Sequence, residues 1–77
     1  MTSWREWIAS DPGVLGGKPV VRGTRLSVAF LLGLLAQGWS REEILANYPQ
    51  LPPEGLQAAL AFAQEVLEEE RLFALSR

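Results

Sequence analysis

The pattern of apolar and polar residues changes near residue 26. Before that point, short apolar runs alternate with glycine and proline, and residues 4–9 and 18–22 have the composition of short strands. Beyond it, apolar residues recur at helical spacing. The pattern predicts one mainly α domain, in which a basic β-like arm (1–26) precedes a three-helix bundle (27–71) and an apolar tail (72–77).

The first predicted helix, residues 28–37, is apolar on nearly every face. Ser27 is a suitable N-cap and Gly38 a suitable residue to follow the end of the helix. A helix that is apolar all round is normally buried on every side, and 77 residues supply little material to surround it. We therefore expect a homodimer, with an interface formed by helix one and the strands: Val20, Val21, Phe30, Leu31 and Leu34.

Two further helices follow. Ser40 and Glu43 have the spacing of a capping box, which opens a short helix that ends near Asn47. Pro53 suits the first turn of a third helix, which we expect to run to Arg71. A short helix, a proline-containing turn and a longer helix together have the outline of a helix-turn-helix in a homeodomain-like bundle.

The composition removes most kinds of enzyme. The chain contains neither cysteine nor histidine, so thiolate zinc sites and imidazole bases are excluded. The glutamates 65, 68, 69 and 70 lie on the expected outer face of the third helix and read as solvated. We expect no catalysis, cofactor, metal or small-molecule substrate. No apolar run suits a bilayer span or a signal peptide, which favours a cytoplasmic protein without membrane contact.

The charge is distributed unevenly although the net charge is only −2. Residues 1–26 carry four basic and two acidic residues, whereas residues 27–77 carry three basic and seven acidic residues. Phosphate contacts therefore fit the amino-terminal arm better than the third helix, whose first turns offer one base-reading candidate. The candidate DNA-binding residues are Lys18, Arg22, Thr24, Arg25 and Gln57. The alternative is an arm without a binding role, whose arginines are exposed to solvent.

The run Gly16-Gly17-Lys18-Pro19-Val20-Val21-Arg22-Gly23-Thr24-Arg25 resembles the family catalogued as domain of unknown function number 433. The resemblance extends over about residues 7–64, and includes Ser40-Arg41-Glu42-Glu43-Ile44 and Tyr48-Pro49-Gln50-Leu51. It implies a homeodomain-like helical fold with a small β arm. It also implies an antitoxin-like role: binding and silencing a PIN-like ribonuclease toxin and repressing the protein's own operon.

For an antitoxin, the end of the third helix and the tail are the candidate toxin-binding segment: Arg71, Leu72, Phe73, Leu75 and Arg77. Apolar anchors beside arginine suit a protein interface, and an arginine could reach an acidic ribonuclease site. The alternative is that these apolar residues fold back on Trp4 and Trp7 or pack across the dimer. The competing function is a protein-binding or oligomerisation module that never contacts DNA.

Overall fold

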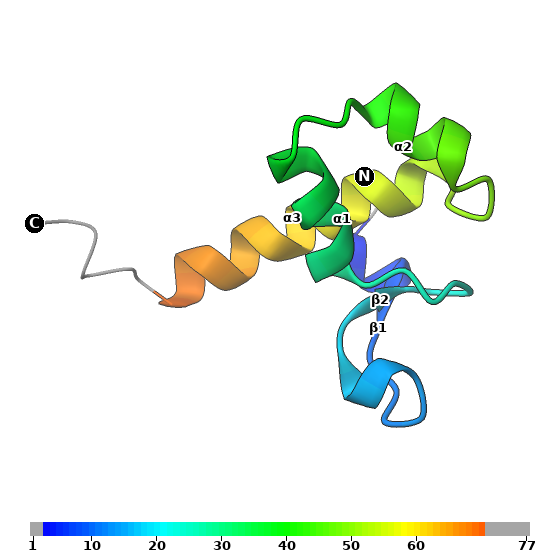
Figure 1. Ribbon diagram of the computed structural model, residues 1–77. Helices are drawn as coiled ribbons and strands as arrows, with labels where there is room; N and C mark the ends of the chain where they lie inside the picture. The colour runs from blue at the N-terminus through cyan, green and yellow to red at the C-terminus, as the bar shows by residue number, and fades with distance from the viewer. Residues whose placement is uncertain (1–2, 71–77) are drawn as a thin grey trace, which may run out of the picture.

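The computed structural model describes residues 3–70 and is mainly α with a small β arm (Figure 1). A 3-10 turn at Trp4–Glu6 leads into strand β1 (Ile8–Ala9), and a second 3-10 turn at Leu15–Gly17 leads into strand β2 (Val20–Val21). Three helices follow: α1 (Val28–Ala36), α2 (Arg41–Asn47) and α3 (Pro53–Glu70). The tail residues Arg71, Leu72, Phe73, Leu75 and Arg77 lie outside the described residues.

The arm is a two-stranded antiparallel sheet in which Ile8 pairs with Val21 and Ala9 with Val20. The expected strand over residues 4–9 is wrong in its first half. The hydroxyl of Ser3 accepts a hydrogen bond from the Arg5 backbone N–H and so caps a 3-10 turn at Trp4–Glu6. Only the last two residues of the segment remain to form β1.

The helix boundaries follow the local signals. The Ser27 hydroxyl accepts from the Phe30 N–H at 2.9 Å and caps α1. At the start of α2, Ser40 accepts from the Glu43 N–H at 3.0 Å, and the Glu43 carboxylate accepts from the Ser40 N–H at 2.7 Å. The predicted capping box is therefore confirmed. Gly38 follows α1 with a φ of 101°, a conformation that glycine adopts without steric cost.

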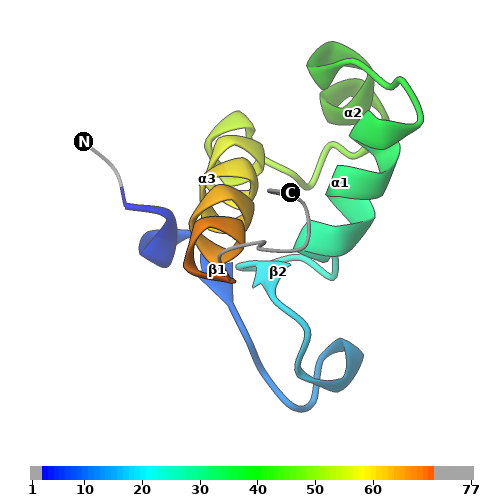
Figure 2. The same ribbon diagram turned by 90° about the vertical axis from the view of Figure 1, so that its left-hand side faces the viewer.

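The core lies where the arm, α1 and α3 meet, and α2 closes it from one end (Figures 1 and 2). Val21, Leu31, Ile44 and Leu56 are its largest fully buried side chains, so the strand and each of the three helices contribute one. Figure 2 shows α1 and α3 side by side with the arm beneath both. The carboxy-terminal half of α3 extends beyond the other elements (Figure 1).

This core changes the expected dimer interface. Val20, Val21, Leu31 and Leu34 are buried within the molecule itself, in a core where α1 packs against α3. A partner therefore cannot reach these four residues. Phe30 is the exception, since 42% of its surface is exposed. The homodimer itself stays a prediction, and its surface must be sought elsewhere.

Within residues 3–70, no helix combines the length and the hydropathy that crossing a bilayer requires.

Candidate binding surfaces

Residues 3–70 contain five basic side chains, and three of them form hydrogen bonds within the molecule: Arg5, Arg22 and Arg41. Arg22 donates from Nε to the carbonyl of Glu6 at 3.2 Å and from Nη2 to that of Arg5 at 3.4 Å. These bonds tie the turn after β2 to the amino-terminal segment. Arg22 was a candidate for DNA contact, and in the structure its guanidinium holds the arm together.

Two other predicted DNA-binding residues also have structural partners. The Thr24 hydroxyl donates to the Val21 carbonyl at 2.8 Å and accepts from the Leu26 N–H at 3.0 Å, which fixes the turn after β2. Gln57 accepts a hydrogen bond from Arg41 at 3.2 Å and so links α3 to α2. The helix-turn-helix outline is present, but the one polar side chain expected to read bases is tied to its neighbouring helix.

The remaining predicted cations, Lys18 and Arg25, are brought together. Both are exposed, and neither side chain forms a hydrogen bond or ion pair within residues 3–70. They line a depression of about 340 Å³ that we call the cationic hollow. Its other lining residues are Leu15, Leu26, Ser27, Phe30 and Tyr48. No acidic residue is among the described residues that line it.

The cationic hollow also displays apolar side chains. Leu15 is 43% exposed, and its φ of 51° places it in the left-handed region that non-glycine residues rarely adopt. Phe30 is 42% exposed and meets the Tyr48 ring edge-on, with 5.6 Å between ring centroids. Backbone strain of this kind persists mainly where the surrounding structure imposes it, often at functional sites. No local sequence pattern predicts this role for Leu15, because its conformation depends on the fold of the whole loop.

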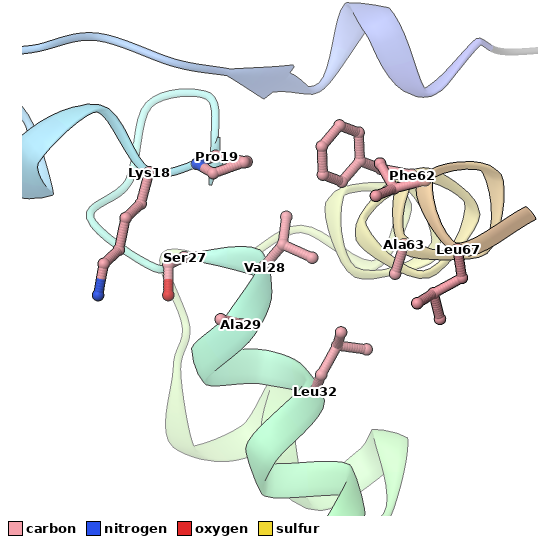
Figure 3. Close-up of a pocket in the computed structure, with 10 residues that line it drawn as sticks. Lys18, Pro19, Ser27, Val28, Ala29, Leu32, Phe62, Ala63 and Leu67 are labelled. Carbon is pink, nitrogen blue, oxygen red and sulfur yellow. The ribbon is translucent and has the colours of Figure 1, made fainter. Parts of the chain in front are cut away.

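A second depression, the apolar groove, lies between α1 and the carboxy-terminal half of α3 and has a volume of about 410 Å³ (Figure 3). Figure 3 shows Val28 and Leu32 of α1 facing Ala63 and Leu67 of α3, with Lys18 beside Ser27 at the start of α1. Leu67 is 52% exposed. The full lining is Lys18, Pro19, Ser27, Val28, Ala29, Leu32, Phe62, Ala63, Val66 and Leu67.

The α3 side of the groove is held by the amino-terminal segment. Glu65 accepts hydrogen bonds from Trp4 Nε1 at 3.1 Å and from the Arg5 guanidinium at 3.2 Å. The Trp4 ring meets Phe62 edge-on at a centroid distance of 4.8 Å. We call these contacts the clasp. Trp4 was a candidate site for the tail to fold back on, and one face of it is occupied by α3.

Within residues 3–70, no group of three acidic, histidine or cysteine side chains could hold a metal ion. The lining residues of both depressions include one phenol, two cations and one serine hydroxyl as their polar side chains. What the two surfaces offer is apolar contact and positive charge.

Comparison with known proteins places the chain in a family. The model of a protein family of unknown function, DUF433, matches residues 8–63, well over half of the chain. The chain belongs to this family. The resemblance read from the glycine-lysine-proline run is thereby confirmed, and the family's description assigns no activity.

Two relatives agree with this assignment. The chain is 42% identical over 60 residues to y4eO, an uncharacterised protein of Sinorhizobium fredii, covering 78% of this chain and 27% of that protein. It is 40% identical to a family member from Anabaena variabilis whose crystal structure is known at 2.00 Å resolution. The folds match with a TM-score of 0.75 over 80% of this chain and 61% of the other. The chain thus spans about a quarter of its curated relative.

Proposed function

We propose that this protein is a non-catalytic, antitoxin-like binding protein that silences a PIN-like ribonuclease by docking a segment of it in the apolar groove. The observation that carries the proposal is the groove itself, an open depression of about 410 Å³ lined almost entirely by apolar side chains. Isolated exposed apolar residues are normal on protein surfaces, whereas a contiguous apolar depression is typical of an interaction site.

The shape and chemistry of the groove suit a helix of a partner protein. Amphipathic helices bind such grooves by inserting apolar side chains spaced three or four residues apart. Leu32 and Leu67 stand on opposite walls, and Phe62 adds an aromatic ring of the kind that contributes strongly to binding energy. The walls are held by the core on the α1 side and by the clasp on the α3 side. A groove fixed in advance costs little ordering on binding.

The test uses a pair of matched substitutions. Ala29 is exposed and lines the groove in the first turn of α1, where a glutamate suits the helix dipole, so Ala29→Glu places a charge in the groove without disturbing the fold. Ala46→Glu adds the same charge on the exposed face of α2. The ligand is a PIN-like ribonuclease, and its binding is measured by calorimetry and by inhibition of RNA cleavage.

We expect Ala29→Glu to weaken binding at least about tenfold, since burying an uncompensated charge costs more than 1.4 kcal/mol. Inhibition of cleavage falls in parallel, and Ala46→Glu behaves as the unaltered protein. A ribonuclease that binds Ala29→Glu as tightly as the unaltered chain would remove the groove from the proposal. No complex with the unaltered chain would remove the antitoxin-like role.

A second candidate function, binding of operator DNA, is favoured by the free side chains of Lys18 and Arg25 in the cationic hollow. Two phosphate contacts contribute about −1.8 to the slope of log affinity against log salt concentration. Fluorescence anisotropy with a duplex from the protein's own promoter should therefore show a slope near zero for Lys18→Ala/Arg25→Ala if these are the only contacts. Arg41→Ala is the control, because Arg41 is engaged with Gln57. An equal loss in both variants would indicate only general charge attraction.

A further inference from the structure

The exposed large apolar side chains of residues 3–70 are Leu15, Phe30 and Leu67. Leu15 and Phe30 lie in the cationic hollow beside Lys18 and Arg25. Leu67 lies near the end of α3 and is followed by the exposed Glu68 and Glu69. We call these three residues of α3 the acidic knob. The molecule therefore presents an apolar hollow with positive charge and an apolar projection with negative charge.

We propose that two copies of this chain exchange these features, each inserting its acidic knob into the cationic hollow of the other. The pairing brings Leu67 of one copy against Leu15 and Phe30 of its partner copy. It also brings the glutamates of that turn, Glu68 and Glu69, to the rim of the hollow that holds Lys18 and Arg25, so that negative charge meets positive charge in each contact. This surface replaces the expected interface of core residues, and it shares Lys18 and Leu67 with the lining of the apolar groove.

The charges of the two features favour the acidic knob of a second copy as the occupant of the cationic hollow. The exposed Glu68 and Glu69 give the acidic knob its negative charge. Lys18 and Arg25 flank Ser27, the N-cap of α1, so the positive end of that helix dipole lies at the hollow. Attraction between complementary patches steers association and fixes orientation. A copy turned the other way would place one acidic knob on another.

The geometry requires a second molecule. No residue of α3 lines the cationic hollow, so the acidic knob does not occupy the hollow of its own molecule. Because each copy carries both features, one twofold axis satisfies both contacts at once, and the association closes at a dimer. Leu15 is held in a strained conformation with its side chain exposed, and the pairing gives that side chain an apolar partner.

Charge reversal gives a sharp test. Lys18→Glu/Arg25→Glu makes the hollow negative, and Glu68→Lys/Glu69→Lys makes the knob positive. All four side chains are exposed, and none of them forms a hydrogen bond or ion pair within residues 3–70. Ala46→Glu/Gln50→Glu, on exposed positions in α2 and the turn after it, is the control for added charge. Mass is measured by sedimentation equilibrium at low and high salt.

We expect the unaltered chain and the control to be dimers, and each reversed variant alone to dissociate with a constant raised about a hundredfold, since facing like charges cost several kcal/mol. An equimolar mixture of the two reversed variants should recover a dimer, because both contacts are then again between opposite charges. Recovery also shows that both variants are folded. A monomeric unaltered chain, dimers in both reversed variants, or a mixture that stays monomeric would each overturn the proposal.

Discussion

At the scale of single residues, Gly55 shows why a poor helix former stands in the first turns of α3. A Cβ atom at this position would lie 2.8 Å from Val21 Cγ1 and 3.4 Å from the ring of Pro52. Val21 is fully buried and cannot move aside. The absence of a side chain therefore lets α3 approach strand β2 closely. Gly33 in α1 is the opposite case, because no such atom lies within 4 Å of the equivalent position.

These two glycines predict opposite responses to the same substitution. Gly33→Ala should raise the free energy of unfolding by about 0.5–1 kcal/mol, the usual gain of alanine over glycine within a helix. Gly55→Ala should lower it, because overpacking a well-filled core costs about 1–3 kcal/mol and outweighs that gain. Urea unfolding followed by circular dichroism measures both. Equal stabilisation by the two substitutions would mean that the contact between α3 and β2 is loose.

Thr24 carries a second prediction at this scale. Its hydroxyl both donates and accepts within the turn after β2, so Thr24→Val removes two hydrogen bonds while keeping the shape of the side chain. We expect a loss of about 1–3 kcal/mol in the free energy of unfolding, at about 0.5–1.5 kcal/mol per bond. Thermal unfolding measures the loss. If Thr24 contacts DNA instead, the substitution lowers affinity for the promoter duplex and leaves the melting temperature unchanged.

At the scale of elements, α2 depends on its capping box. This helix is only seven residues long and buries one of them, Ile44, so its own packing is limited. Ser40→Ala removes the hydrogen bond to the Glu43 N–H and should lower the free energy of unfolding by about 1 kcal/mol. Ser40→Asp should recover most of that loss, since aspartate is an equally good N-cap. Chemical unfolding measures the free energy of unfolding of the two variants and of the unaltered chain. Equal stability of all three would contradict a stabilising role of the capping box.

The elements also show what local signals can predict. Ser27, Ser40 and Gly38 act within a few residues of themselves, and the helices they delimit were predicted nearly to the residue. The segment at residues 4–9 was only half predicted. Its 3-10 turn is capped locally by Ser3, but Trp4 also bonds to Glu65, 61 positions away. No local pattern contains information about that contact.

The binding surfaces were harder to predict for the same reason. Lys18 and Arg25 were identified because they are basic residues in a glycine-rich arm. The hollow they share depends on Tyr48 and Phe30, which only the packing of the helices brings beside them. Similarly, the sequence of α1 is apolar on all sides and cannot show which face stays uncovered. Leu31 and Leu34 are buried whereas Phe30 is exposed, and this difference between the faces of α1 is set by the tertiary fold.

At the scale of the whole molecule, the position of the apolar groove links the two proposals. The groove lies between Lys18 and Leu67, which are contact points of the proposed twofold pairing (Figure 3). In a twofold dimer held by these two contacts, the surface between Lys18 and Leu67 faces the same surface of the second copy. The two grooves of the dimer are then turned toward each other, and a partner segment must compete with the second copy.

This competition predicts a dependence on concentration. The apparent affinity for the ribonuclease segment should fall as the concentration of the unaltered chain is raised through its dimerisation range, because the competent monomer becomes a smaller fraction. The monomeric variant Glu68→Lys/Glu69→Lys should show no such fall. Calorimetric titrations at several protein concentrations measure this. A concentration-independent affinity in the unaltered dimer would show that the groove stays open after pairing.

The clasp has a consequence for the order in which the protein acquires its binding surface. Trp4 and Arg5 are synthesised before their partner Glu65, which follows 61 and 60 positions later. The Leu32 wall of the groove can form with the arm and α1, whereas the α3 wall waits for the far end of the helix and for a long loop to close. A nascent chain therefore carries no finished groove, and partner binding is confined to molecules whose synthesis has passed α3.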